Sequence, residues 1–385
     1  MAEESAAMVI PEETINAVTN INEHKGPTWL VEKIEHAESI ALNRPSHQTI
    51  LSIYRVPHSL RELNKEVYTP QVISIGPFHY RSQKLQSMEI YKLRYFRSDN
   101  LRQIILVDAT FIIEFFLRAW SEEFLGDDDS IEAEPWALLS RIESDLILLE
   151  NQLPFFIIEK LYELLPLDQS PSIYPSSFLE LTFNFFENQN VQNIRHDEID
   201  SEEVMHFVDL LRYFYLPCHQ MLPARSGKAV NEIYCASQLA EAGLKFKPSS
   251  SRSIIDLKFN EGVLEIPRFT LRHDTEIYAR NLIALEQCVY QFERYVTDYF
   301  IMLDFLINTG KDVDLLIQQG ILVNEMGTNN IRPPFAGNLC TVILKSSLKH
   351  DYFRTPWMGA VTIGAIILLI FTLIQTVCTV ISTFK

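Results

Sequence analysis

Three acids or bases set among apolar residues are the side chains that could do chemistry in this chain. Glu150 lies in DLILLENQLPFFIIEKLYELL, His206 lies in VMHFVDLLRYFYLP, and Glu286 lies in RNLIALEQC. Apolar surroundings shift the pKa values of carboxyl and imidazole groups, and enzymes use this effect to tune general acids and bases. These three residues are therefore the candidates for acid–base catalysis.

The same residues also have a structural interpretation. Because proline disfavours helical geometry in the residue before it, Pro154 predicts that one helix ends near Gln152 and that a second begins with Pro154 in its first turn. Glu150, Asn151 and Gln152 would then form a structural polar cluster that satisfies backbone groups at the helix junction. An unpaired buried charge is costly, so we expect Glu150 to bond to backbone amides or a nearby cation. His206 is expected to be a packed or capping histidine.

No sequence motif supplies partners for these groups. The chain contains no G-x-S-x-G, H-E-x-x-H, P-loop or G-x-G-x-x-G pattern. The acidic run at 127–129 is interpreted as a solvated loop, because hard cations need several converging oxygen ligands. No C-x-x-C pair is present, so reduced and mostly buried thiols are expected at Cys218, Cys235, Cys288, Cys340 and Cys378. We therefore predict no catalytic residue, no cofactor and no metal.

Composition and periodicity favour a mainly α fold with a few short edge strands. Glycine is scarce, at 12 of 385 residues, and the formal net charge of -17 excludes a general nucleic-acid binder. Extended pieces are expected at 53–56 and 72–75, and a hairpin or edge pair is expected within 253–276. Helical spacing and caps predict helices at 28–44, 108–120, 145–152, 154–165, 204–217, 277–309 and 313–319, and one ending at Gly243. Gly310 and Gly320 are expected to end the last two helices, and Asp312 to cap the last.

Residues 357–384 contain no charged side chain and are long enough to cross a bilayer as one helix. Trp357 would lie at the headgroup level, Gln375 is a polar residue within the span, and Gly364 makes a small-xxx-small step with Ala360. Lysine and arginine precede the span, whereas Lys385 alone follows it. The charge pattern predicts a C-terminal anchor with the larger N-terminal part in the cytosol.

The N-terminal residues do not read as a secretory signal, because they carry Glu3, Glu4, Glu12 and Glu13 where positive charge is required. The predicted organisation has four parts. A mobile acidic N-terminus spans 1–27, one large helical domain spans 28–340, a short stem spans 341–355, and the anchor spans 356–385. The plasma membrane and the endoplasmic reticulum both remain open as its location.

Several motifs occur together in order: IYRVP, LRELNKEVYTPQVISIGPFHY, DLILLENQLPFF, ASQLAEAGLKFK, GVLEIPRFTL with DTEIYARNLIALEQC, and PW before the terminal span. Over residues 30–385 the chain resembles the plant domain of unknown function 247 family. The resemblance implies a plant, single-pass, C-terminally anchored protein without an established activity. Some members are connected to recognition in grass self-incompatibility, which implies interaction. Compared with the family pattern, the chain is shortened near 96–107 and in the stem.

Two functions remain open from the sequence. The first is a membrane-tethered cytosolic interaction or recognition module, with an unknown protein partner, the lipid bilayer as its other contact, no nucleic acid and an unassigned oligomeric state. The second is a membrane-associated enzyme that uses Glu150, His206 or Glu286 as acid or base. An open pocket that exposes Glu150 with His206 would favour the enzyme, and a filled core would favour the module.

Overall fold

The computed structural model describes residues 53–80, 82, 85, 101–121, 134–165, 174–217, 222–223 and 234–325 of the chain. The chain divides into two compact units. Unit 1 consists of Met1–Tyr54, Thr69–Gln189 and Ile194–Leu210. Unit 2 consists of Arg55–Tyr68, Asn190–Asn193 and Leu211–Lys385. The predicted domain over 28–340 includes residues of both units.

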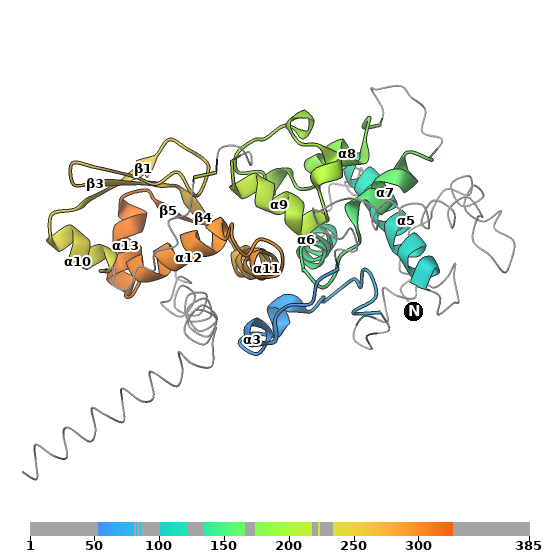
Figure 1. Ribbon diagram of the computed structural model, residues 1–385, viewed down its shortest axis with the longest axis horizontal. Coiled ribbons are helices and arrows are strands. Elements are labelled where there is room, and N and C mark those ends of the chain that lie inside the picture. Colours follow the sequence, from blue (N-terminus) through green and yellow to red (C-terminus); the bar gives the residue numbers. More distant parts are fainter. Residues whose placement is uncertain are drawn as a thin grey trace, which may run out of the picture. The chain divides into compact units, whose positions relative to one another are not determined.

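Unit 1 is built from helices (Figure 1). Its elements are α5 (Leu101–Trp120), α6 (Glu134–Leu146), α7 (Phe155–Tyr162), α8 (Phe178–Phe185), three 3-10 turns (Glu187–Gln189, His196–Glu198 and Ser201–Glu203) and the first half of α9 (Phe207–Tyr215). The helix predicted at 108–120 is α5, which begins seven residues earlier than expected.

Aromatic rings fill the core of unit 1. Phe116 of α5 is completely buried and stacks on Phe185 with ring centroids 4.0 Å apart and on Phe178 at 5.9 Å. Phe207 lies 5.6 Å from the same ring. Since α5 also contacts α7 and α8, these rings join the helices of the unit, and such pairs stabilise cores beyond simple burial.

Residues 71–76, which we call the strap, run through unit 1 outside any helix or strand. The prediction for 72–75 allowed an edge strand or an isolated extension, and the structure has the isolated extension. Val72, Ile73 and Ile75 are buried. Buried backbone N–H groups require acceptors, and side chains of α5, of α6 and of the turn after α6 supply them.

Unit 2 combines helices with two small sheets (Figure 1). Its helical elements are α3 (His58–Arg61), a 3-10 turn (Glu66–Tyr68), the second half of α9, α10 (Ala236–Glu241), α11 (Thr275–Cys288), α12 (Tyr295–Leu306) and α13 (Gly310–Gln318). Its strands are β1 (Lys245–Ser249), β2 (Lys258–Asn260), β3 (Val263–Pro267), β4 (Phe269–Leu271) and β5 (Leu322–Asn324). α10 packs with α13, and α13 contacts β5.

The first sheet has the order β1-β3-β2, with β1 parallel and β2 antiparallel to β3, and β4 pairs with β5 in parallel. A two-residue turn joins β2 to β3, in which Glu261 and Gly262 have φ values of 47° and 77°. Positive φ at both positions is the geometry of tight hairpins. The predicted hairpin within 253–276 is therefore confirmed.

The described part of the chain is helical with a few short strands, as expected, but β3 lies between β1 and β2 and is not an edge strand, and some boundaries were wrong. α6 ends at Leu146 and not near Gln152. The side-chain amides of Asn151 and Gln152 donate to the carbonyls of Asp145 and Leu146. Residues that were expected to continue the helix therefore close its C-terminal end.

The predicted long helix at 277–309 is also wrong, because α11 ends at Cys288 and α12 begins at Tyr295. The break brings the Glu286 carboxylate to the first backbone N–H groups of α12. Gly310 begins α13 instead of ending a helix, and Thr309, not Asp312, is its cap residue.

Two glycine predictions are confirmed, because Gly243 and Gly320 follow helices with φ of 100° and 71°. In the part of the chain that the structure describes, no helix is both long and apolar enough to cross a membrane. The anchor residues Trp357, Gly364 and Gln375 lie outside the described residues, as do the helix at 28–44 and the acidic run at 127–129.

Two buried polar clusters as the candidate functional site

The first cluster, which we call the ENQ cluster, lies in unit 1 and consists of Asp108, Asp145, Glu150, Asn151 and Gln152. The first two and Asn151 bind the strap. Asp145 Oδ2 accepts hydrogen bonds from the backbone N–H groups of Val72 at 2.6 Å and Ile73 at 2.8 Å. Its Oδ1 accepts one from Gln71 at 2.9 Å. Burial raises the pKa of the Asp145 carboxyl, whereas these three donors act in the opposite direction.

Asn151 continues the support along the strap. Its Oδ1 accepts from the Ile75 N–H at 2.7 Å, and its Nδ2 donates to the Ile73 carbonyl at 3.1 Å and the Asp145 carbonyl at 2.9 Å. The side chain thus binds the strap with both of its polar atoms. Because it is completely buried, losing either partner would leave a polar group without water or a substitute.

Gly76 closes the strap at a position where only glycine fits. Its N–H donates to Asp108 Oδ2 at 2.7 Å, and its φ is 71°. A Cβ atom here would lie 2.7 Å from the Gln152 carbonyl oxygen. The left-handed backbone and the close approach both exclude a side chain.

Gln152 connects two helix ends. Its Nε2 lies 2.5 Å from the Leu146 carbonyl oxygen and 2.9 Å from that of Leu148, at the end of α6. Its Oε1 accepts the N–H of Phe207, the first residue of α9, at 3.0 Å. One side chain therefore satisfies backbone groups at the end of one helix and the start of another.

Glu150 is 4% exposed, and its Oε2 lies 3.6 Å from His79 Nε2. The His79 side chain is 10% exposed. The cation expected beside Glu150 is thus an imidazole when His79 is protonated. The stability role that the sequence assigned to Glu150 stays a prediction.

His206 is a capping histidine, one of the two alternatives expected from the sequence. It is completely buried, and its Nδ1 accepts from the Asp209 N–H at 3.1 Å in the first turn of α9. Burial lowers the pKa of His206 to about 3. A general base needs a pKa near the working pH, so this environment does not suit His206 to that role.

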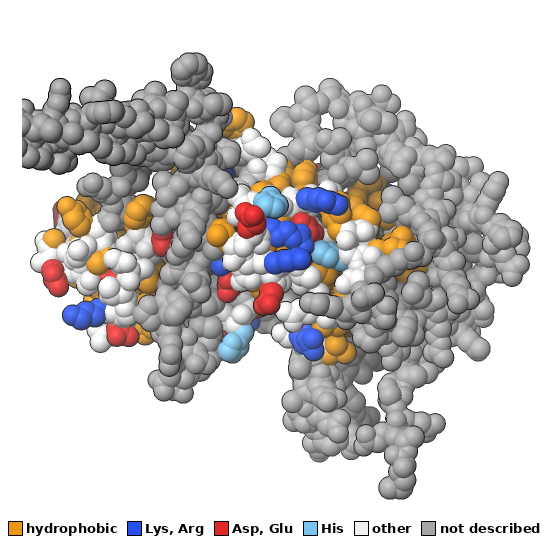
Figure 2. Space-filling view, turned by 90° about the horizontal axis from the view of Figure 1, so that it is seen from below, with side chains coloured by type: hydrophobic (Ala, Val, Ile, Leu, Met, Phe, Trp, Pro, Cys, Tyr) orange, Lys and Arg blue, Asp and Glu red, His pale blue; other side chains and the backbone are white. Residues whose placement is uncertain are grey.

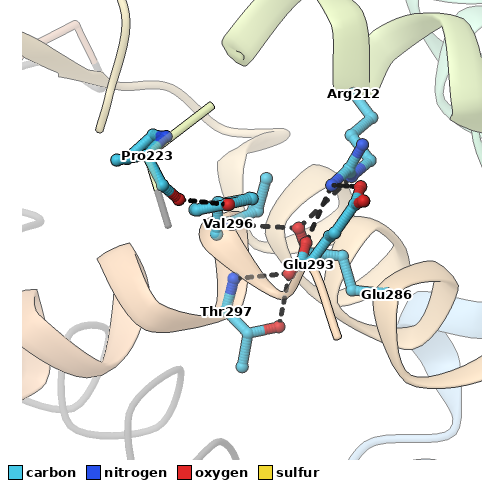
Figure 3. Close-up of polar contacts among 7 residues, drawn as sticks. Arg212, Pro223, Glu286, Glu293, Val296 and Thr297 are labelled. Carbon is cyan, nitrogen blue, oxygen red and sulfur yellow. Dashed lines mark hydrogen bonds and ion pairs between the residues drawn. The ribbon is translucent and has the colours of Figure 1, made fainter. Parts of the chain in front are cut away.

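The second cluster, the Glu286 cluster, lies in unit 2 (Figure 3). Glu286 Oε1 accepts from Arg212 Nε at 3.3 Å and from the Val296 N–H at 3.0 Å. Its Oε2 accepts from the Thr297 N–H and hydroxyl, both at 2.7 Å. The carboxylate therefore sits at the N-terminus of α12, where the helix dipole favours negative charge.

Arg212 completes the Glu286 cluster. Its Nη2 donates to the Glu293 carbonyl at 2.8 Å and lies 3.9 Å from the Glu293 carboxylate, and its guanidinium lies 3.9 Å from the centre of the Tyr290 ring. Glu286 is completely buried. Burial raises the pKa of Glu286, and the Arg212 guanidinium and the Thr297 and Val296 donors oppose that rise.

The three candidate catalytic residues are divided between the two units, and all three are buried. Glu150 and His206 belong to unit 1 and Glu286 to unit 2, and their exposed fractions are 4%, 0% and 0%. Among the described residues, no group of three or more His, Cys, Asp or Glu side chains is placed to hold a metal. The described cysteines, Cys235 and Cys288, are free thiols.

Sequence reasoning missed Asp108, Asp145, Arg212 and His79. The available signal was charge within apolar runs: Asp108 and Asp145 each begin such a run, and Arg212 interrupts LLRYF. Their partners lie far away in the sequence: 74 residues separate Asp145 from Gln71 and Arg212 from Glu286, and 81 separate Arg212 from Glu293. No local spacing could have paired them.

The fold and the two clusters define a mainly helical protein whose buried polar side chains bind its own backbone. The family described as plant protein of unknown function matches residues 53–100 and 96–346. The chain belongs to this family, the plant domain of unknown function 247.

Two relatives from Arabidopsis thaliana are UPF0481 proteins. The chain is 25% identical to UPF0481 protein At3g47200 over 432 positions, which cover 90% of this chain and 89% of the relative. It is 23% identical to the putative UPF0481 protein At3g02645 over 446 positions, which cover 83% of each. Both alignments are longer than the 385 residues of this chain, so the relatives contain residues without a counterpart here. No solved structure matches the chain.

Proposed function

We propose that this protein is a membrane-tethered interaction or recognition module. Residues 357–384 anchor it in the bilayer, the larger N-terminal part faces the cytosol, and that part binds a protein partner. The observation that carries the proposal is the use of the buried polar groups: the ENQ cluster holds the strap and two helix ends, and the Glu286 cluster holds the start of α12. Polar side chains that already bind the chain's own backbone stabilise the fold. In this proposal, the partner binds to the surface of that rigid fold.

The surface supports protein binding more than binding to nucleic acid. Figure 2 shows basic, acidic and histidine side chains interspersed among hydrophobic ones on the described part of one face. A protein that binds the phosphate backbone of a nucleic acid needs a continuous positively charged surface. Aromatic side chains are enriched in protein interfaces, and Tyr234 and Phe259 are 65% and 67% exposed.

The uncharged length of residues 357–384 and the positive charges before it support the anchor and its orientation. The plasma membrane and the endoplasmic reticulum are both compatible with this proposal. A monomer and an oligomer are compatible with it as well.

Proximity labelling followed by pull-down from plant membranes tests the proposal. The full chain is compared with a control chain in which residues 357–384 are replaced by an unrelated single span. We expect both chains to enrich the same cytosolic protein, because the N-terminal part makes the contact. Enrichment of lumenal proteins alone, or of none above a span-only control, contradicts the proposal.

The alternative is a membrane-associated enzyme that uses buried carboxylates. The observation in its favour is that burial raises the pKa of both Asp145 and Glu286, as it does for catalytic acids. Against it, each carboxylate already accepts at least three hydrogen bonds. A Glu286→Gln chain that keeps its fold and its partner but loses a measurable turnover would favour the enzyme.

A further inference from the structure

A reciprocal pair of hydrogen bonds closes the turn that begins α9 in unit 1. His206 Nδ1 accepts from the Asp209 backbone N–H at 3.1 Å, and Asp209 Oδ2 accepts from the Met205 backbone N–H at 3.0 Å. Because Nδ1 is an acceptor, the neutral ring must carry its proton on Nε2. The cap therefore requires one particular protonation state of His206.

The surroundings of His206 do not compensate a positive charge well. Nε2 is buried and has no hydrogen-bond partner among the residues that the structure describes. The Tyr54 ring meets the imidazole edge-on, with centroids 6.2 Å apart. Within the described part of the chain, the titratable groups Tyr54 and Asp209 contact this turn. The segment that leads into α7 contributes uncharged groups beside His206, since Gln152 accepts the Phe207 N–H and the Phe155 N–H donates to the Met205 carbonyl.

We infer that His206 is an acid-sensitive latch for the start of α9. A second proton on the imidazole occupies Nδ1, removes the acceptor of the Asp209 N–H and opens the turn between Met205 and Asp209. The same turn contains the Phe207 N–H that binds Gln152 and the Met205 carbonyl that binds the Phe155 N–H at 2.8 Å. Opening it therefore loosens one side of the ENQ cluster. This regulation goes beyond the proposed interaction function.

Whether acid opens or closes the turn depends on which of the two forms binds more protons. In the closed turn the pKa of His206 is lowered to about 3, whereas an open histidine titrates near 6.5. The open form binds more protons, so its population relative to the closed form rises about tenfold for each pH unit below 6.5. Between pH 7 and pH 5 the rise is about 25-fold. At pH 7 and above the latch stays closed.

Hydrogen exchange on the full chain at pH 7 and pH 5, corrected for intrinsic rates, measures the opening at residues 205–209. The test variant is His206→Asn, which keeps a capping oxygen and does not titrate. The matched control is His196→Asn, which removes a histidine with a 41% exposed side chain from the same unit. We expect about a 25-fold loss of protection on acidification in the wild type and the control, and a much smaller loss in His206→Asn. An equal loss in all three chains overturns the inference.

A second measurement needs no variant. In the wild-type chain labelled with 15N-histidine, the ring signals of His206 should stay those of the neutral form with Nε2 protonated while the turn is closed, even at pH 5. If closed His206 titrates near pH 6.5, the latch does not exist.

Discussion

At the scale of single residues, most polar side chains of the two clusters bind backbone groups of the chain. Asp145, Asn151 and Asp108 bind N–H groups of the strap, and Glu286 binds those that begin α12. Buried polar groups of this kind stabilise a fold only when all their partners are present. The loss of stability caused by a substitution should therefore depend on which buried partner it leaves without a hydrogen bond.

Glu150→Ala should destabilise the chain by about 1 to 3 kcal/mol, because it removes the carboxylate beside His79 and leaves buried partners unsatisfied. Glu150→Gln should have a smaller effect, since it keeps the shape and one acceptor. Thermal melting of the full chain measures both. The control is Glu163→Ala, which removes an acid with a 51% exposed side chain. Wild-type stability of both Glu150 variants would contradict a structural role.

Gly76→Ala should be much more destabilising than Gly320→Ala. Both glycines have φ of 71°, so the backbone strain of a Cβ, about 1 to 2 kcal/mol, is common to the two. Only at Gly76 would the Cβ also meet a backbone oxygen, at 2.7 Å, whereas nothing lies within 4 Å at Gly320. The difference between the urea unfolding midpoints of the two variants measures the effect of the contact with the Gln152 carbonyl oxygen. Equal midpoints would show that the strap can move away from Gln152.

At the scale of elements, helix interiors could be predicted from the sequence, whereas helix ends could be predicted only where a glycine or proline marks them. The apolar spacing located α5, α7, α9 and α13, and glycine located the ends of α10 and α13. The break between α11 and α12 has no proline or glycine to mark it. It exists because the Glu286 carboxylate accepts two N–H groups from residues 10 and 11 positions later, a contact that periodicity does not encode.

The candidate site could be predicted in part for the same reason. Asn151 and Gln152 stood out as amides at a proline-marked junction, which is local information. The strap could not be recognised in this way. Its apolar residues have the pattern of a strand, and the acceptors of its backbone N–H groups belong to Asp108 and Asp145, far along the chain. Side chains thus accept the hydrogen bonds that a neighbouring strand would accept in a sheet. The apolar pattern alone does not distinguish a strand from a segment held by side chains.

Glu286→Ala should destabilise the chain by about 3 to 5 kcal/mol, because it leaves Arg212 as a buried charge without its carboxylate. Arg212→Lys should also be destabilising, since lysine cannot keep the stacking on Tyr290 together with the bonds to Glu286 and Glu293. Glu265→Ala, which breaks a surface ion pair with Lys247, should change stability by about 0 to 1 kcal/mol. Denaturant unfolding of the three variants compares them. A Glu286→Ala effect as small as that of Glu265→Ala would show that α12 begins without this carboxylate.

At the scale of the whole molecule, the proposed anchor makes two measurements decisive for topology. Protease added to sealed vesicles should digest residues 53–325, because the proposal places them on the cytosolic side. Removal of residues 355–385 should release the chain from membrane pellets. Protection of 53–325 in intact vesicles, with digestion after detergent, would reverse the orientation.

Gly364→Ile tests whether the proposed span associates with itself. The small-xxx-small step with Ala360 allows helices to approach closely, so the larger side chain should weaken association in a membrane two-hybrid assay. The control is Ile366→Leu, a volume-matched change in the same span. Unchanged association in Gly364→Ile would leave Gly364 as lipid-facing surface.

The way the strap is held has a consequence for synthesis on the ribosome. Ile73 is made 72 residues before Asp145, its acceptor. At about 5 to 20 residues per second, about 4 to 14 s pass before that carboxylate is made. During this interval the nascent chain carries Val72, Ile73 and Ile75 as an extended apolar segment with open backbone donors, which is what chaperones bind. Translation speed between codons 73 and 145 therefore bears directly on the yield of folded protein.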